Sequence, residues 1–461
     1  MTQQFQDQGG AASMDPNPLV RWLTSTIMTR LSRPQRWEKR RAQSEKQRIK
    51  AGHPHVVEYF HQVDDGYSHL AAQVLPALAA RYDIELVCHL VCGPEGKNVP
   101  EPELLLGLSR YDAFHVAPDY GLEFPRHEAA PDPTLVKIAG TILAAQDDPG
   151  FIDCVAEVGR LLWAGDERGL KALAEQRGSA TQAQADAKIE SGTARRHKLQ
   201  HYSGAMFYYG QEWYWGVDRL YHLEQRLAEL GIDRQPGQAM VMPRPDVDVA
   251  QLRDDGSLTL EVYPSLRSPY SAISFDRAVK LAQDSGVKLV VRPVLPMVMR
   301  GVPATRQKGM YIFGDAAREA WEAGVPYGNF SDPIGEPVRR CYSLYPWACE
   351  QGKGNELLSS FFNCAFVTGV NTNNDKGLKT VVEKAGLDWE QARRIVGQPG
   401  WESVLEANRL AMYEAGLWGV PSFRLLDDKG EQLLALWGQD RLWLFAREIQ
   451  RQLAGRADRT Q

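Results

Sequence analysis

The sequence is poor in cysteine and contains no long hydrophobic run. Its six cysteines among 461 residues form no CxxC pair, and Cys88 and Cys92 are separated by three residues. Six dispersed thiols do not make a disulfide framework, so we interpret them as reduced cysteines of a cytoplasmic protein. No stretch approaches the roughly 20 apolar residues that span a membrane. The first ten residues also lack the charged and apolar regions of a secretory signal.

Several sequence motifs that indicate a particular kind of binding or catalysis are absent as well. The chain has no GxxxxGK[ST], no GxGxxG after a strand and no GxSxG, so phosphate-loop, dinucleotide-binding and hydrolase functions have no support. His53, His55 and His61 lie close together, but no carboxylate pair at helical spacing accompanies them, and we expect no metal site. A net charge of −5 gives no case for binding nucleic acid.

The composition is that of a globular protein, with 43% hydrophobic and 24% charged residues. A chain of this length divides into two or three domains. Residues 1–52 form an appended leader, in which Leu19 to Leu31 can make an amphipathic helix and the stretch up to Lys50 is strongly basic. Such a segment can lie on an anionic membrane or dock on an acidic protein partner. Alternatively, it is a solvated helical arm that packs across the protein's own acidic surface.

Elements alternate along the first half in the order typical of an α/β domain, which we place at residues 53–231. A strand, a helix and a second strand open it, a helical stretch follows, and a strand pair with an aromatic run precedes a last helix. We expect the aromatic run to be sheet core rather than a ligand cage. The expected elements are 55–60, 67–82, 84–91, 103–200, 205–215 and 218–230.

The same order restarts after a linker at 232–257 that is rich in Pro, Asp and Gly. We place the second domain at residues 258–454, again as a strand, helix and strand followed by a helical insertion, a strand pair and a helix. The expected elements are 258–263, 271–286, 287–294, 308–415, 421–438 and 440–453.

The two halves also align residue by residue. VVEYFHQVDDGYSHLA, from Val56, aligns without gaps on TLEVYPSLRSPYSAIS, from Thr259, which pairs Asp65 with Ser268. Near the other end, WGVDRLYHLE matches WGQDRLWLFARE. Two matches in the same order, at opposite ends of each half, indicate an internal duplication.

A candidate site lies at the first helix of the second half. In SPYS, Ser268 is a good helix N-cap and Pro269 occupies the position where a missing N–H costs nothing, so the motif needs no function to explain it. Near the end of the half, GVPSF places Pro421 just before a strand. If that peptide bond is cis, Val420 offers its backbone groups beside the helix start.

These features resemble the DsbA-like branch of the thioredoxin superfamily. More narrowly, they look like the 2-hydroxychromene-2-carboxylate isomerase and kappa-class glutathione transferase family. The resemblance covers almost all of residues 258–452 and implies two tandem thioredoxin-like domains, each with a helical insertion. It rests on SPYS, on Arg292–Pro293, on KGMYIFGDAAREAWEAG from Lys308, on EKAGLD at 383–388, on GVPSF and on WGQDRL.

The resemblance implies glutathione as the cofactor and Ser268 as the catalytic residue, in the place of a nucleophilic cysteine. Ser268 would hydrogen-bond the glutathione sulfur at the helix N-terminus, where the helix dipole favours a thiolate. The backbone of Val420, next to Pro421, would pair with the cysteinyl unit, and Asp440 would receive the γ-glutamyl amine. The alternative for Asp440 is ordinary helix capping. The implied reaction is isomerisation or transfer on a small hydrophobic or aromatic electrophile.

The chain departs from the family pattern in both halves. The loop VLPMVMRGVPATRQKG supplies no Asn, and Asn371 stands where relatives have Asp. In the first half Asp65 replaces the serine and Ala205 replaces the proline, which indicates a degenerate copy. The alternative function is therefore a non-catalytic, thioredoxin-like binding or scaffold protein. A dithiol oxidoreductase is not expected, because neither helix start carries a cysteine.

Overall fold

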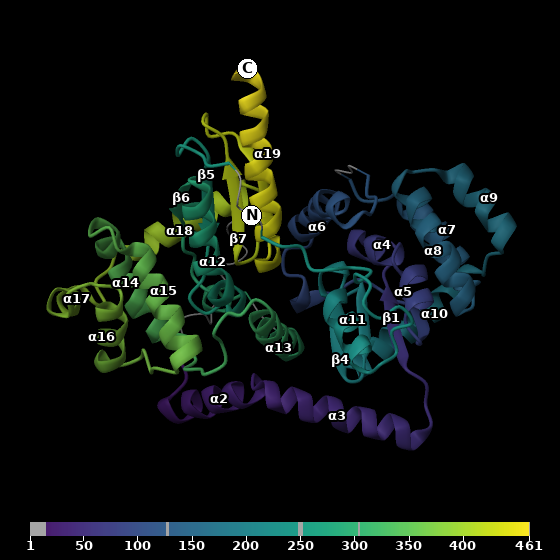
Figure 1. Cartoon of the computed structure of the whole chain (residues 1–461), viewed down its shortest axis with the longest axis horizontal. Helices are drawn as coiled ribbons and strands as arrows, with labels where there is room; N and C mark the ends of the chain where they lie inside the picture. The colour runs from purple at the N-terminus through teal and green to yellow at the C-terminus, as the bar shows by residue number, and fades with distance from the viewer. Residues whose placement is uncertain (1–14, 126–128, 248–251, 303–304, 461) are drawn as a thin grey trace. The chain divides into compact units, whose positions relative to one another are not determined.

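The computed structural model describes residues 15–125, 129–247, 252–302 and 305–460 (Figure 1). The chain forms two compact units. The first-half unit is Trp37–Pro245, and the second-half unit combines Met1–Arg36 with Asp246–Gln461. The border at 245/246 falls inside the expected linker, whereas the expected leader is divided at 36/37. The domain boundaries at 53, 231, 258 and 454 stay predictions.

The first-half unit contains a four-stranded sheet in the order β2-β1-β3-β4. β1 pairs with β2 in parallel and with β3 antiparallel, and β3 pairs antiparallel with β4. Parallel pairing requires a crossover between β1 and β2, which the helices between them supply. The strands are β1 (Val56–His61), β2 (Glu85–Leu90), β3 (Met206–Tyr209) and β4 (Glu212–Trp215).

Helices surround this sheet. The stretch expected to be one helix at 67–82 is two, because Pro76 cannot donate a backbone hydrogen bond inside a helix and instead starts the second one. The helices are α3 (Pro34–Ala51), α4 (Gly66–Ala72), α5 (Leu75–Arg81), α6 (Pro102–Val116), α7 (Pro133–Ala144), α8 (Asp148–Trp163), α9 (Glu167–Arg177), α10 (Gln182–Lys198) and α11 (Leu220–Glu229), with short 3₁₀ turns at Gly96–Asn98, Pro118–Tyr120 and Val217–Arg219.

The second-half unit has a sheet with the same order and directions, β6-β5-β7-β8. β5 pairs in parallel with β6 and antiparallel with β7, and β7 pairs antiparallel with β8. This arrangement and its helices make the second half an α/β domain with the order of elements that its sequence predicts. The strands are β5 (Thr259–Tyr263), β6 (Lys288–Val291), β7 (Ser422–Leu426) and β8 (Gln432–Trp437).

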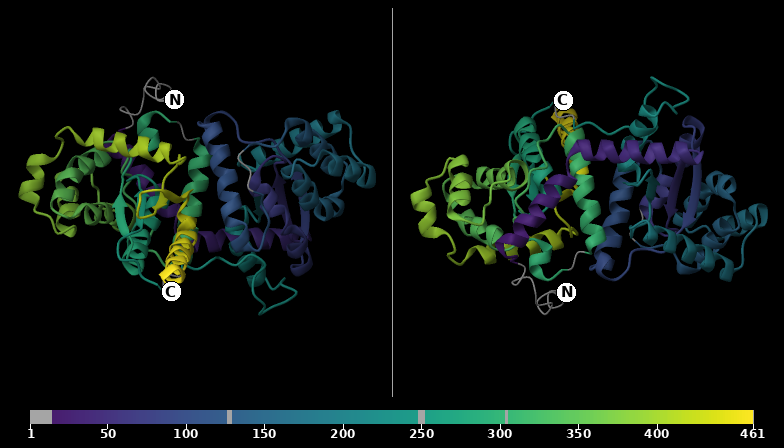
Figure 2. Two further views of the ribbon diagram at one scale, coloured as in Figure 1. Left: turned by 90° about the horizontal axis from the view of Figure 1, so that it is seen from above. Right: turned by 90° about the horizontal axis from the view of Figure 1, so that it is seen from below.

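The helical insertion of the second-half unit gathers beside its sheet, while α12 and α19 pack together and flank the strands (Figures 1 and 2). The last helix begins at Leu442 rather than Asp440, because a 3₁₀ turn precedes it. The helices are α2 (Pro18–Leu31), α12 (Pro269–Ser285), α13 (Arg306–Glu322), α14 (Glu336–Glu350), α15 (Gly354–Phe362), α16 (Asp375–Lys384), α17 (Trp389–Ile395), α18 (Trp401–Glu414) and α19 (Leu442–Thr460), with 3₁₀ turns η5 (Met297–Arg300) and η7 (Gln439–Arg441) and a π-helical turn η6 (Asn363–Thr368).

Each unit has its own core. In the first-half unit the aromatic run lies in the sheet, and Phe207 and Tyr214 are fully buried beside Tyr59. In the second-half unit a large cluster fills the insertion, and Phe275 on α12 joins it by packing its ring at a tilted angle against Phe362. The cysteines are free thiols distributed over both units. Over the described residues, every helix is too short or too polar to cross a membrane.

Candidate active site at the start of helix α12

Ser268 lies between strand β5 and helix α12 and is the N-cap of that helix, as predicted. Its Oγ accepts a hydrogen bond from the backbone N–H of Ser271 at 3.1 Å, and Pro269 follows in the first turn. The residue is half-buried, so its hydroxyl sits at the edge of the core rather than inside it. The serine therefore satisfies one of the free N–H groups of the first helical turn, and part of the residue stays exposed to solvent.

The Val420–Pro421 peptide bond is cis, the geometry on which the sequence prediction was conditional. The structure brings Val420 directly to the helix start, where the Ser268 hydroxyl donates to its carbonyl oxygen at 3.4 Å. Hydroxyl-to-oxygen hydrogen bonds usually measure about 2.5–3.0 Å, so this contact is long and weak. Pro421 itself is buried, and its carbonyl accepts the Gly438 N–H at 3.0 Å.

Asp440 lies in the 3₁₀ turn η7, which packs against helix α12. The neighbouring Gln439 holds this turn: its amide donates to Glu319 on α13 at 2.7 Å and accepts from Arg277 on α12 at 3.2 Å. The Asp440 carboxylate is 21% exposed and lies 3.7 Å from the Arg441 guanidinium. Because the Gly438 N–H donates to the Pro421 carbonyl, the turn that carries Asp440 lies next to the residue that follows Val420.

Lys308 is a charged residue near this region that sequence reasoning did not single out. It lies in the first turn of α13, it is buried, and its Nζ is 5.5 Å from the centre of the Trp418 ring, two residues before Val420. Burial lowers the pKa of this lysine to about 8. The sequence shows a lysine at the start of a helix, which is ordinarily solvated, and no pattern of neighbours reveals its burial.

The sequence departs from the family pattern at Asn371 and in the loop after β6, and the structure describes the first fully and the second in part. Asn371 is exposed, and its Oδ1 accepts the N–H of Asn373 at 3.1 Å. The loop after β6 contains the 3₁₀ turn η5, while residues 303–304 lie outside the described residues. Asn371 therefore has an ordinary local role.

In the first-half unit Asp65 occupies the corresponding helix start. Its carboxylate caps α4, accepting the Ser68 backbone N–H and the Ser68 hydroxyl, both at 2.8 Å. Burial raises the pKa of Asp65 to about 6, although the hydrogen bonds from Ser68 oppose the change. At neutral pH the group is mostly ionised, which disfavours an approaching thiolate at this position.

Ala205 occupies the position of Pro421 in the first-half unit. Its φ of +54° lies in the left-handed region, and its backbone N–H donates to the Ser68 hydroxyl oxygen at 2.9 Å. A proline has no N–H and a φ near −65°, so Pro421 could offer neither feature. Polar groups at this helix start are consequently bonded to one another.

The histidines near the start of β1 have structural partners. His55 Nδ1 lies 2.6 Å from the Tyr209 hydroxyl, and His61 Nδ1 lies 3.0 Å from the Tyr59 hydroxyl. Burial lowers the pKa of His61 to about 3, which keeps its ring neutral. Within the described ranges no three His, Cys, Asp or Glu side chains are placed to share a metal ion.

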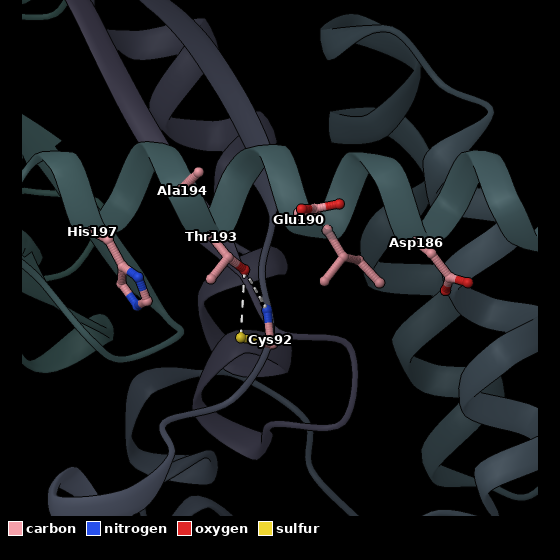
Figure 3. A pocket seen from close by; sticks show the side chains of 7 residues that line it. Cys92, Asp186, Glu190, Thr193, Ala194 and His197 are labelled. Carbon is pink, nitrogen blue, oxygen red and sulfur yellow. Dashed lines mark hydrogen bonds between the residues drawn. The ribbon is translucent and has the colours of Figure 1, made fainter.

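One surface hollow lies in the first-half unit, and its lining includes none of the predicted site residues. It has a volume of about 440 Å³ and lies between one face of helix α10 and Cys92 (Figure 3). Thr193 accepts the Cys92 N–H at 3.0 Å and donates to its sulfur at 3.5 Å. The lining residues are Cys92, Asp186, Ile189, Glu190, Thr193, Ala194 and His197.

The comparison with protein families matches the second half of the chain. Residues 259–450 match the model of the DSBA-like thioredoxin domain. The chain is 23% identical over 192 residues to a 2-hydroxychromene-2-carboxylate isomerase of Sphingobium xenophagum, a match that covers 40% of this chain and 94% of that protein. A solved structure of a 2-hydroxychromene-2-carboxylate isomerase has a TM-score of 0.37 and 22% identity, over 43% of this chain and 98% of its own. The cytosolic disulfide reductase DsbM from Pseudomonas aeruginosa has a TM-score of 0.33 and 19% identity, over 42% of this chain and 99% of its own.

Proposed function

We propose that the DsbA-like thioredoxin domain of residues 259–450 binds glutathione at the start of helix α12 and uses it to act on a small hydrophobic or aromatic electrophile. The reaction class is isomerisation or glutathione transfer. The similarity to a 2-hydroxychromene-2-carboxylate isomerase, over nearly the whole of that protein, supports this class. The absence of a cysteine at Ser268 argues against a dithiol mechanism.

The hydrogen bonding of Ser268 is the observation that carries the proposal. Its oxygen is used by the Ser271 N–H, but its proton goes to the Val420 carbonyl over 3.4 Å. A thiolate is a much stronger acceptor than a backbone carbonyl at that distance, so the hydroxyl can turn to it at little cost. The N-terminus of the 17-residue helix α12 adds a positive partial charge at the same place. Together they favour the thiolate form of a bound thiol.

The other predicted residues would hold the rest of the tripeptide. Val420 is half-buried and precedes strand β7, so its peptide groups could pair with an extended ligand as a short added strand. The Asp440 carboxylate would receive an ammonium group. Bound glutathione would supply a thiolate nucleophile that adds reversibly to a conjugated carbon. The domain's own part is to stabilise that charge and to exclude water.

We further propose that the first-half unit is a degenerate copy of the same domain and serves as a scaffold. Its sheet has the same strand order and directions, but its helix start carries Asp65 and its counterpart of Pro421 is Ala205. Its polar groups are bonded to one another. The free thiols of both units fit a cytoplasmic location.

A second candidate function is a thioredoxin-like binding or scaffold protein without catalysis. The observation in its favour is that Asn371, which stands where relatives have Asp, is bonded within its own loop to Asn373, and that the loop after β6 carries no Asn. Under this alternative Ser268 would be a helix cap and nothing more.

Calorimetric titration of reduced glutathione into the full chain tests the proposal. We expect saturable binding that is weakened at least about ten-fold by Ser268→Ala, because a hydrogen bond to a charged group contributes about 1.5–3 kcal/mol. Asp440→Ala should weaken binding similarly. Asp218→Ala is the matched control, since Asp218 is the counterpart of Asp440 in the repeat and bonds Tyr120 in the first-half unit.

The outcomes separate the two functions. Binding that Asp218→Ala leaves intact, and that Ser268→Ala weakens, would support the glutathione site and justify a screen of aromatic electrophiles. No heat at millimolar glutathione, from a protein with a cooperative thermal transition, would overturn the enzyme proposal and leave the scaffold function. Equal losses in Asp218→Ala and Asp440→Ala would place the ligand elsewhere.

A further inference from the structure

Helix α2 is attached to the second-half unit by a row of polar side chains, beside which the half-buried Met28 and Leu31 pack against the core cluster. The buried or half-buried positions Arg21, Ser25, Thr29 and Ser32 follow one another at spacings of four, four and three residues. At about 100° per residue these positions share one side of the helix. Polar side chains at helical spacing ordinarily face solvent, so a buried polar row of this kind is unusual for a surface helix.

The contacts on this side are hydrogen bonds to the backbone of residues 328–334. Arg21 donates to the carbonyls of Asp332 and Ile334 at 2.6 and 2.7 Å. Ser25 accepts the Asp332 N–H at 2.9 Å.

Two further hydrogen bonds continue the same row toward the end of the helix. Thr29 accepts the Phe330 N–H at 3.0 Å, and Ser32 donates to the Gly328 carbonyl at 3.0 Å. Arg21 is itself 3% exposed, so the helix is fixed in this orientation by a buried charged residue with several partners.

The opposite face of α2 is apolar and exposed. Leu19 is 71% exposed, Trp22 63%, Leu23 51% and Ile27 47%. These side chains have spacings of three and four residues, so they form one stripe. Scattered exposed apolar residues are normal, but a contiguous stripe on a helix whose other side already packs against its own unit indicates an interaction surface.

The charge around the stripe indicates what covers it. The sequence has no acidic residue from Pro16 to Trp37, while Arg30, Arg33 and Arg36 are exposed. Arg30 lies on the same side of α2 as Leu19 and Leu23 by helical spacing. A second copy of the chain would bring like charges together at such a surface, whereas anionic headgroups would neutralise them.

We propose that the outer face of α2 binds an anionic lipid surface. With 14 residues the helix cannot span a bilayer and would lie in the interface. The apolar stripe would enter the boundary between headgroups and acyl chains, Trp22 would sit at headgroup depth, and the arginines would contact lipid phosphates. This proposal stands independently of glutathione binding, because none of its residues belongs to that site.

Co-sedimentation of the full chain with sucrose-loaded vesicles tests it. Vesicles of phosphatidylcholine alone are compared with vesicles containing 30% phosphatidylserine. We expect Leu19→Ser/Leu23→Ser to weaken binding at least about ten-fold through lost apolar burial. Arg30→Gln/Arg33→Gln should weaken binding to the anionic vesicles about 25-fold, at about five-fold per arginine. Val404→Ser/Leu410→Ser is the matched control, because both residues are exposed on α18 of the same unit.

The co-sedimentation experiment separates lipid binding from self-association and from no binding. The proposal is supported by binding that requires phosphatidylserine, that falls at 0.5 M salt, and that the α18 control leaves unchanged. Absence of binding to either vesicle would overturn it. So would a concentration-dependent dimer in sedimentation velocity that Leu19→Ser/Leu23→Ser abolishes, since the stripe would then be a self-association surface. The salt dependence of the unaltered protein keeps the test valid if a double variant fails to fold.

Discussion

Helices α4 and α12 begin the same way in the two units and differ in what their first polar groups are bonded to. In both, a tyrosine in the first turn donates to a buried aspartate of the next long helix. Tyr67 reaches Asp112 at 2.7 Å, and Tyr270 reaches Asp315 at 2.8 Å. These matching contacts hold the helix start in each unit independently of any ligand. The presence of this tyrosine–aspartate bond in both units therefore does not indicate which of the two helix N-termini is functional.

The difference lies in the third helical position and its neighbours. In both units a buried serine hydroxyl oxygen accepts the N–H of the residue six positions earlier, at 3.2 Å for Ser68 and 3.2 Å for Ser271. Ser68 also accepts from Ala205 and donates to Asp65, which closes a local network. No N–H is available from proline at the matching place in the second-half unit. Because Pro421 donates no hydrogen bond to Ser271, polar groups at the N-terminus of α12 are less fully paired within the protein and more available to a ligand.

Introducing the proline of the second-half unit into the first-half unit should have the largest effect. Ala205→Pro removes the N–H donated to Ser68 and demands a φ near −65° where the backbone has +54°. We expect a loss of about 4 kcal/mol in the stability of the first-half unit, from backbone incompatibility and one lost hydrogen bond. Hydrogen exchange of strand β3 amides measures it, with strand β7 as the internal reference. A loss below about 1 kcal/mol would mean that this loop can adopt the conformation of the Pro421 loop, and the proposed difference between the two helix N-termini would be wrong.

The matched carboxylates of the first strands should show the next largest effect. Burial alone would raise the pKa of Glu58, but hydrogen bonds from Arg195 and His89 outweigh it and lower the pKa to about 2. A lowered folded-state pKa stabilises the protein above about pH 4.5, and this stabilisation is lost as the pH falls toward 2. Glu58→Gln should therefore cost about 3 kcal/mol at pH 7 and little at pH 2.

The control for this prediction is the equivalent change in the other sheet. Glu261 bonds to Arg292 at 2.7 Å and to the Tyr263 hydroxyl at 2.8 Å. Glu261→Gln should alter amide exchange in β5 and β6 and leave β1 and β2 unchanged. If Glu58→Gln costs the same at pH 7 and pH 3, the carboxylate is not stabilised by its ion pairs and the interpretation of the pKa is wrong.

Much of the fold is visible in the sequence because caps and periodicity are local. The order of strands and helices in both halves follows from apolar runs and from cap residues such as Ser268, and the structure has the same order. The missed break before α5 was also local, since Pro76 marks it. The start of α19 at Leu442 was not visible, because a 3₁₀ turn and an α-helix share the same residue preferences.

What depends on tertiary contact could not be read from the sequence. The pattern of residues 19–31 predicts an amphipathic helix, but it does not say which side the protein buries, and the burial of Arg21 together with Met28 and Leu31 depends on tertiary contact. Lys308 is buried only because α13 packs near Trp418. The contact between Ser268 and Val420 spans 152 residues of chain, and it was foreseen through the family resemblance rather than through spacing.

The titration of Asp65 distinguishes the N-termini of α4 and α12 by a smaller change in stability than the two variants above. Its folded pKa of about 6 lies above the unfolded value near 4, so the unfolded chain holds fewer protons between these pH values. The stability of the first-half unit should accordingly fall as the pH rises from 4 to 6 and stay lower above that. Asp65→Asn keeps a capping oxygen and should gain about 2 kcal/mol at pH 8 with no gain at pH 4.

A second N-cap aspartate provides a control of opposite sign. Asp132 caps α7 at the surface, and its hydrogen bond from the Thr134 N–H lowers its pKa. Asp132→Asn should therefore lose stability, not gain it, as the pH rises. Urea unfolding at pH 4, 6 and 8 compares the variants. A gain for Asp65→Asn at pH 4 equal to that at pH 8 would show that the carboxyl is not ionising inside the folded unit.

The smallest expected effect concerns the hairpins that close the two sheets. The β3–β4 hairpin turns in two residues, Gly210 and Gln211, with φ of +52° and +69°, whereas the β7–β8 turn is longer and places Gly430 at +82°. A left-handed glutamine is unfavourable, so Gln211→Gly should stabilise the first-half unit by up to about 1 kcal/mol. Gly430→Ala should destabilise the second-half unit by about 1 kcal/mol, because a Cβ added at this position would meet no other atom and the cost is purely conformational. Urea midpoints with unit-resolved hydrogen exchange measure both. Opposite signs would show that the shorter hairpin carries the strain, whereas a loss in both variants would mean that the Gln211 side chain contributes a contact worth more than its backbone costs.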